Sequence, residues 1–207
     1  MVTSAIPQIQ VVSVTAVSDR PVVRITIRNN FSQPLTAVEF ISGDIGEKID
    51  SLNGLQPDST ILAAGAELTE DFPLANVNNN AIRVALAVTS DGEYYGDERS
   101  IEFTKIRRRI FQVELKKLIA MMEAESLNPP DEAISHIRTF IRNGINNPST
   151  QKKESSAYGA FDNSFDHLER TVKGKSQEEA ERKFTEVIKR AKDRDAQLSV
   201  ALRGGVQ

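Results

Sequence analysis

The sequence contains no cysteine, which excludes disulfide bonds, thiolate metal sites and a cysteine nucleophile. Histidine is scarce too, because His136 and His167 are the only two. Each lies beside the apolar stripe of an expected helix, and the neighbouring Ser135 and Asp166 would point away from them. No spacing of histidines with carboxylates resembles a metal site, and no glycine-rich loop resembles a phosphate cradle. We therefore predict no catalytic residues, no cofactor and no metal, and hence no enzyme.

Long apolar runs are missing as well. No run approaches the roughly 20 residues that a membrane helix needs, and residues 1–10 lack the basic and apolar segments of a signal peptide. We expect a soluble chain without a membrane span. A signal peptide trimmed before Met1 would leave both the cytoplasmic and the extracytoplasmic location open.

The residues that are present change character near Thr104. Residues 1–104 carry 6 basic and 14 acidic side chains, a net charge of −8, whereas residues 105–207 carry 20 and 15, a net charge of +5. The apolar period changes at the same place, from about two residues to about 3.6. These two changes predict two domains, residues 1–104 and 105–207, with no flexible linker between them.

The first part has the alternation of β-strands, as in residues 22–28, where Val and Ile alternate with Arg and Thr. We predict strands at about residues 9–17, 21–29, 35–43, 66–72, 81–89 and 99–104. Turn residues separate them, for example Asp91-Gly92. Strands at this spacing, with no helix among them, predict an all-β immunoglobulin-like sandwich. Residues 44–65 are rich in glycine and are expected to hold short edge strands or a binding loop.

The second part has helical spacing, and we predict four helices that form a bundle. They are expected at about residues 105–125, 131–146 and 155–173, and from the capping box that begins at Ser176 to the Gly204-Gly205 pair. The first helix has an unusually wide apolar face, so we expect it to be contacted on more than one side. The residues of this face are Ile106, Ile110, Phe111, Val113, Leu115, Leu118 and Met122.

Several turn and core segments of residues 8–104 resemble those of bacterial immunoglobulin-like accessory domains of the CARDB or FxLYD kind. The segments are Asn29-Asn30, Ser32-Gln33-Pro34-Leu35 leading to Val38, residues 62–67 and 84–88, Asp91-Gly92 and Gly96-Asp97. One departure is Ala64-Gly65-Ala66, where such domains often have a proline before the glycine. The resemblance implies the fold and says little about a ligand. It also implies an extracytoplasmic location, periplasmic or secreted, because such domains usually occur in envelope or secreted proteins.

Two charged groups are candidate sites. Asp91, Glu93, Asp97 and Glu98 fall in one expected hairpin, where they could bind calcium, although a solvated hairpin tip is the more ordinary interpretation. The basic run contains Arg107, Arg108 and Arg109, with Lys116-Lys117 two turns later. We expect these arginines to form an interdomain contact with the acidic first part. The other interpretations are a solvated helix face and an anion contact to nucleic acid or anionic lipid.

Two functions remain open. The first is a non-catalytic interaction module, expected in the bacterial cell envelope, that binds a protein or glycan partner through a loop end or strand edge and through its helices. The alternative is a cytoplasmic nucleic-acid or anionic-surface binder that uses the basic helical half. Binding to phosphates weakens steeply with salt, so a salt titration separates the two functions. The identity of the partner and the oligomeric state are left open by the sequence.

Overall fold

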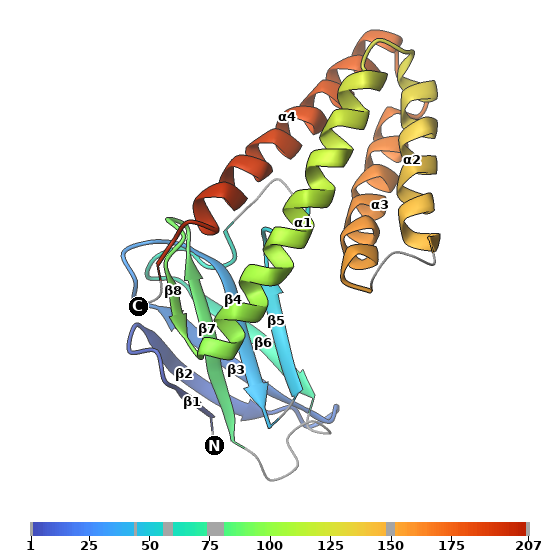
Figure 1. Cartoon of the computed structure of the whole chain (residues 1–207). Coiled ribbons are helices and arrows are strands. Elements are labelled where there is room, and N and C mark those ends of the chain that lie inside the picture. The colour runs from blue at the N-terminus through green and yellow to red at the C-terminus, as the bar shows by residue number, and fades with distance from the viewer. Residues whose placement is uncertain (1, 44, 56–59, 74–80, 148–151, 206–207) are drawn as a thin grey trace. The chain divides into compact units, whose positions relative to one another are not determined.

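The structure is a computed structural model that describes residues 2–43, 45–55, 60–73, 81–147 and 152–205. The chain has an α+β fold, with strands in its N-terminal part and helices in its C-terminal half (Figure 1). It divides into two compact units. The β-sheet unit comprises residues 1–51, 58–104 and 203–207, and the helical unit comprises residues 52–57 and 105–202.

In the described ranges the β-sheet unit contains eight strands, and the first residues of α1 also belong to it. The strands are β1 (Val2–Ser4), β2 (Ile9–Ala16), β3 (Val22–Asn29), β4 (Leu35–Ser42), β5 (Ile45–Asp50), β6 (Glu67–Pro73), β7 (Ile82–Thr89) and β8 (Tyr94–Gly96). The helices are α1 (Glu98–Glu125), α2 (Pro130–Asn146), α3 (Lys152–Val172) and α4 (Gln177–Ala201).

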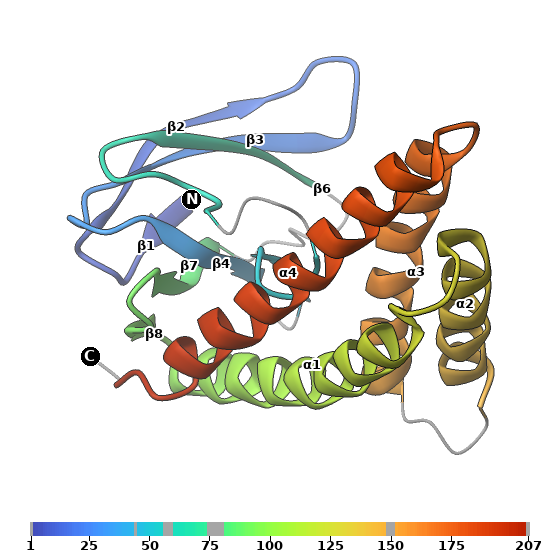
Figure 2. The ribbon, with the colours of Figure 1, turned by 90° about the horizontal axis from the view of Figure 1, so that it is seen from above.

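The strands form two sheets, seen as separate layers in Figure 2. One sheet has the order β1-β7-β4-β5, with β8 also paired to β7, and the other has the order β2-β3-β6. All pairs are antiparallel except β1 with β7. Both sheets contribute to one apolar core, for example Ile25 and Ile27 from β3 and Val38 and Phe40 from β4. Burial of these side chains holds the two sheets together.

Five of the predicted strands are confirmed, each within one residue of its expected bounds. They correspond to β2, β3, β4, β6 and β7. The expected short strand in residues 44–65 is β5. The sequence did not predict β1 and β8, which have three residues each, too few to show an alternating pattern.

The predicted strand at residues 99–104 is wrong, because α1 begins at Glu98. Asp97 starts the helix, since its carboxylate accepts a hydrogen bond from the Ser100 N–H group at 3.2 Å, as an N-cap residue does. Ile101 then packs with Leu86, Val88 and Tyr94 in a second cluster of the β-sheet unit. This contact explains why the first turns of α1 belong to the β-sheet unit.

All four helices contribute to one core in the helical unit, which includes Phe111, Ile137, Phe161 and Phe184. The C-terminal helices follow the expected bounds closely, and Ser176 caps α4 by accepting a hydrogen bond from the Glu179 N–H group at 3.3 Å. The expected wide apolar face of α1 is only partly buried, because Val113 is 54% exposed. Among the helices as described, none is long and apolar enough to cross a membrane.

Candidate functional site

The most distinctive surface feature of the β-sheet unit is strand β2. In the part of the chain that the structure describes, β2 pairs with β3 on one side and with no strand on its other side. Its side chains are largely exposed from Val12 to Ala16. We call residues 12–16 the β2 edge. Such an edge presents unpaired backbone donors and acceptors to a further strand.

The hydrogen-bond pattern shows which residues carry those free backbone groups. Val17 donates to the carbonyl of Val22 at 3.2 Å, so this pair is a hydrogen-bonded one. Hydrogen-bonded and non-hydrogen-bonded pairs alternate along an antiparallel ladder. Val14, opposite Ile25, and Ala16, opposite Val23, therefore point their N–H and C=O groups away from β3.

The side chain of Val14 lies on the core side of its sheet, because its cross-strand partner Ile25 is a core residue with 1% exposure. Val14 is nevertheless 45% exposed, and Val12 is 41% exposed. The register between β2 and β3 shifts at Val12, which marks a bulge. The β2 edge thus combines free backbone groups with uncovered apolar side chains.

The longer edge strands β5 and β6 differ from β2 in charge, whereas the three-residue edge strands β1 and β8 are also uncharged. Strand β6 carries Glu67, Glu70 and Asp71 and ends in Pro73, and β5 carries both acidic and basic side chains. Charged residues and proline are the usual means by which proteins protect an edge from strand addition. No charged residue and no proline occurs from Ile9 to Ala16. The sequence shows this lack of charge. It does not show that β2 is an edge strand.

Two of the four acidic residues of the candidate calcium site form separate contacts in the structure. Asp91 accepts a hydrogen bond from Thr89, and Asp97 caps α1 and pairs with Arg83 at 3.1 Å. The bond to Arg83 and the Ser100 N–H group hold the pKa of Asp97 below its usual value. Within the described residues no three His, Asp or Glu side chains lie close enough to hold a metal ion.

The three arginines of the basic run lie on one turn of α1 in different environments. Arg108 is fully buried, Arg107 is half-buried and Arg109 is exposed. They therefore do not form a continuous exposed basic surface. Docking of the two parts through these arginines stays a prediction.

Both histidines are exposed, but one has a partner that the sequence did not indicate. His136 Nδ1 lies 2.8 Å from Glu125 Oε2, which brings the end of α1 to α2. The hydrogen bond from His136 lowers the pKa of Glu125. The side chain of His136 is 56% exposed, so this pair lies at the surface of the helical unit.

Some residues of the segment 44–65, where a binding loop was considered, are part of a hydrophobic core. Leu52 and Leu55 are buried, with 2% and 4% exposure, and belong to the core of the helical unit. Residues 56–59 lie outside the described residues, so a ligand-binding role of this loop stays a prediction.

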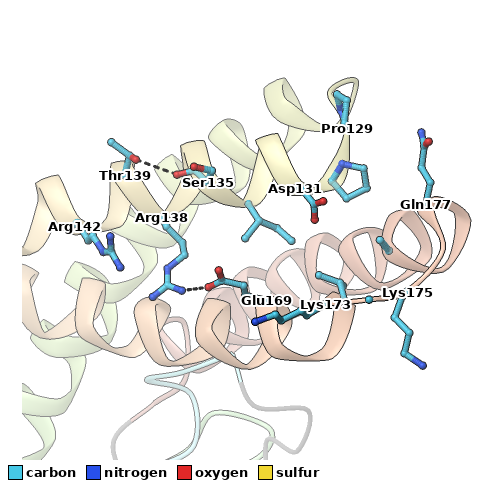
Figure 3. Close-up of a pocket in the computed structure, with 15 residues that line it drawn as sticks. Pro129, Asp131, Ser135, Arg138, Thr139, Arg142, Glu169, Lys173, Lys175 and Gln177 are labelled. Atoms are coloured by element: carbon cyan, nitrogen blue, oxygen red, sulfur yellow. Dashed lines mark hydrogen bonds and ion pairs between the residues drawn. The ribbon is translucent and has the colours of Figure 1, made fainter.

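A groove of about 610 Å³ lies on the helical unit (Figure 3). We call it the α2–α3 groove, and the start of α4 also contributes to it. Its floor is formed by the buried apolar residues Ile134, Val172 and Ala180. Its charged lining residues are Asp131, Arg138, Arg142, Glu169, Lys173 and Lys175. The sequence analysis did not single out this groove, because its residues come from three separate helices.

Comparison with protein-family models, with curated proteins and with solved structures gives no match to this chain. The functional argument therefore rests on the residues and their geometry.

Proposed function

We propose that this chain is a non-catalytic interaction module that binds an extended segment of a partner protein along the β2 edge. The segment would add to the three-stranded sheet as a further strand beside β2. In this mode the main chain supplies affinity and the side chains next to it supply specificity. The observation that carries the proposal is the combination of free backbone groups and uncharged, exposed side chains from Val12 to Ala16.

We further propose that the β-sheet unit is an immunoglobulin-like domain. The sheet orders β2-β3-β6 and β8-β7-β4-β5 support this, because they correspond to strands A-B-E and G-F-C-C′ of that fold. The cell-envelope location belongs to the same proposal, and its support is the resemblance of residues 8–104 to bacterial accessory domains.

The β2 edge favours a protein over a glycan partner. Val14 and Ala16 together offer about four backbone groups, and each added hydrogen bond contributes about 0.5–1.5 kcal/mol net. A peptide strand matches the spacing of these groups, whereas a glycan does not repeat it. Burial of Val12 and Val14 would add to the affinity at about 25 cal/mol per Å² of apolar surface.

The test is a selection of displayed random peptides on the immobilised full chain, followed by binding measurements with the recovered peptides. Val14→Pro removes the outward N–H group while leaving the bonds between β2 and β3 in place. Val14→Thr keeps the N–H group and a β-branched side chain, and so serves as the matched control. We expect Val14→Pro to weaken binding at least about tenfold, the loss of one to two such bonds and of strand alignment.

The control should bind within about threefold of the original chain, because its backbone is unchanged. Circular dichroism of both variants checks that the sheet is intact. Equal peptide binding by the original chain and by a folded Val14→Pro variant would contradict strand addition at β2.

The alternative, binding of nucleic acid or an anionic surface by the basic helical half, has less support. Many of its basic side chains already pair with carboxylates, for example Arg138 with Asp166, and Lys192 with Glu123 at 2.6 Å. Association with phosphatidylserine vesicles or single-stranded DNA that weakens steeply between low and physiological salt would favour this alternative.

A further inference from the structure

The space between α3 and α4 has the features of a small-molecule site that is separate from the β2 edge. We infer that it binds a small monoanion with an apolar tail, whose anionic head group contacts Arg190. This inference does not depend on the function proposed for the β-sheet unit.

Helices α3 and α4 meet at the turn that contains Gly174 and diverge away from it (Figures 1 and 2). Between them lies a hollow of about 360 Å³, which we call the α3–α4 pocket. Its apolar lining residues are Leu55, Leu168 of α3 and Val187 of α4, and none of them is more than 6% exposed. The volume is in the range of small-molecule sites.

The charge of the α3–α4 pocket comes from two basic residues. They are Lys183 and Arg190, and no aspartate or glutamate is among the described residues that line the pocket. Lys183 is engaged, because it pairs with Glu186 at 3.1 Å. Glu186 also pairs with Arg182 at 2.7 Å, so this one carboxylate already serves two cations. The hydrogen bond from Lys183 and the charges of all three surrounding cations lower the pKa of Glu186.

Arg190 supplies the available charge of the pocket. It is half-buried, and its Nε atom donates to the backbone carbonyl of Glu186 at 3.5 Å. Its two terminal nitrogens form no hydrogen bond or ion pair with the residues that the structure describes. Neighbouring N–H groups of a guanidinium match the two oxygens of a carboxylate, and they match a phosphate equally well. A partly desolvated guanidinium with free donors therefore favours a bound anion.

The apolar lining begins next to Arg190. Val187 precedes Arg190 by three residues on α4, so their Cβ atoms are neighbours on one face of the helix, about 5–6 Å apart. Leu55 and Leu168 belong to the same hydrophobic core as Val187. A short apolar tail can therefore cover these side chains while its head group reaches Arg190. The opposite arrangement, a polar molecule without a tail, would leave this apolar lining in contact with water.

NMR titration of the isotope-labelled full chain tests the inference, because amide shifts report both affinity and place. Butanoate, hexanoate and octanoate vary the length of the tail, and acetate has the head group without a tail. Hexanamide has the same tail as hexanoate and a neutral head group. Hexyl phosphate distinguishes a preference for phosphate from a preference for carboxylate.

We expect hexanoate to bind about tenfold more tightly than hexanamide, because a hydrogen bond to a charged acceptor is stronger than one to a neutral acceptor. Affinity should rise about two- to fourfold for each added methylene group. The largest shifts should occur around Leu168, Val187 and Arg190.

Arg190→Gln should lower the affinity for hexanoate to that for hexanamide, since it removes the charge and keeps a long side chain. Arg190→Lys should bind with intermediate affinity, because lysine keeps the charge without the paired donors. Lys189→Gln is the matched control, because Lys189 is an exposed neighbour on α4 that does not line the pocket. Circular dichroism of the three variants checks that the helices are intact.

Several results would overturn the inference. No binding of any of these anions at millimolar concentration is the first. Equal affinity for hexanoate and hexanamide would indicate a merely apolar hollow, and equal affinity for acetate and octanoate would show that no tail is bound. Equal weakening by Lys189→Gln and Arg190→Gln would indicate non-specific charge attraction. Shifts confined to residues outside α3 and α4 would place the anion elsewhere.

Discussion

Gly144 lies in the interior of α2, where alanine would normally be the better helix former by about 0.8–1 kcal/mol. At this position we expect Gly144→Ala to destabilise the protein instead. An ideal Cβ atom at residue 144 would lie 2.5 Å from Cε1 of Tyr158. Contacts this short do not occur in folded proteins, so the tyrosine ring or the helix would have to move.

The ring of Tyr158 has little freedom to move. It is 6% exposed, and its hydroxyl donates a hydrogen bond of 2.6 Å to Oε2 of the buried Glu114. Burial and the bond to Glu114 raise the pKa of Tyr158, so its hydroxyl remains a donor at neutral pH. Overpacking costs about 1–3 kcal/mol, and losing a hydrogen bond to a charged group costs about 1.5–3 kcal/mol. Allowing for the gain in helix propensity, we expect a net loss of about 1.5–5 kcal/mol.

Gly159 provides a matched control in α3. It is also inside a helix, but a Cβ atom there would have no neighbour within 4 Å. We expect Gly159→Ala to stabilise the protein by about 0.5–1 kcal/mol. Urea unfolding, followed by the circular dichroism signal of the helices, gives the midpoint of unfolding for both variants. The two substitutions should shift this midpoint in opposite directions.

The same measurement in a Tyr158→Ala background tests the mechanism. Without the ring, Gly144→Ala should become neutral or stabilising, because the clash is removed. If Gly144→Ala stabilises the original chain as much as Gly159→Ala does, then the ring of Tyr158 does not pack against α2 at Gly144.

Asn29 is fully buried, and its Nδ2 donates to the carbonyls of Gln33, Leu62 and Ala63 at 2.9–3.2 Å. We therefore expect Asn29→Asp to lower the free energy of unfolding, measured with urea at neutral pH, by about 2–3 kcal/mol. A decrease below about 0.5 kcal/mol would contradict this role of Asn29. Because the pKa of Asp97 is lowered in the folded state, its stabilisation is present above the usual carboxyl pKa of about 3.9 and is lost as pH falls through the lower folded value. Between neutral pH and pH 2, the urea midpoint of unfolding should therefore fall less steeply for Asp97→Asn than for the original chain. Parallel plots of midpoint against pH for the two proteins would refute this. Replacing the exposed His136 and His167 by alanine should change the free energy of unfolding by less than about 1 kcal/mol and leave peptide binding intact. A folded variant that loses peptide binding would show that the histidines have a functional role.

Strands β3 and β7 were predictable because large apolar side chains recur at every second position along their eight residues. Residues 99–104 misled the prediction because Ile101 and Phe103 alternate with polar residues, as in a strand. Asp97, a residue type that favours the N-cap position, was a better indication that a helix begins here. A helix at this place also requires Ile101 to pack against an apolar residue of the β-sheet unit, and Tyr94 provides that contact. Local patterns thus identify most elements, whereas the start of α1 depends on a tertiary contact.

The candidate sites depend even more on the tertiary structure. A strand such as β2 can lie at the centre or at the edge of a sheet, and only pairing decides between them. The α2–α3 groove similarly requires Arg142 and Lys173, which are 31 positions apart in the sequence, to share one surface. Neither arrangement leaves a local pattern in the sequence.

The β-sheet unit includes residues from beyond the helices, and this affects how the chain is made. The carbonyl of Gly205 accepts a hydrogen bond from the Tyr94 N–H group at 3.2 Å. Gly204 packs so closely on Gly92 that a Cβ atom would lie 1.7 Å from the Gly92 carbonyl oxygen. A ribosome that adds about 5–20 residues per second needs roughly 5–20 s between residues 104 and 203. During that interval the β7–β8 turn lacks its contacts with Gly204 and Gly205. The helices therefore have time to form before the β-sheet unit is complete.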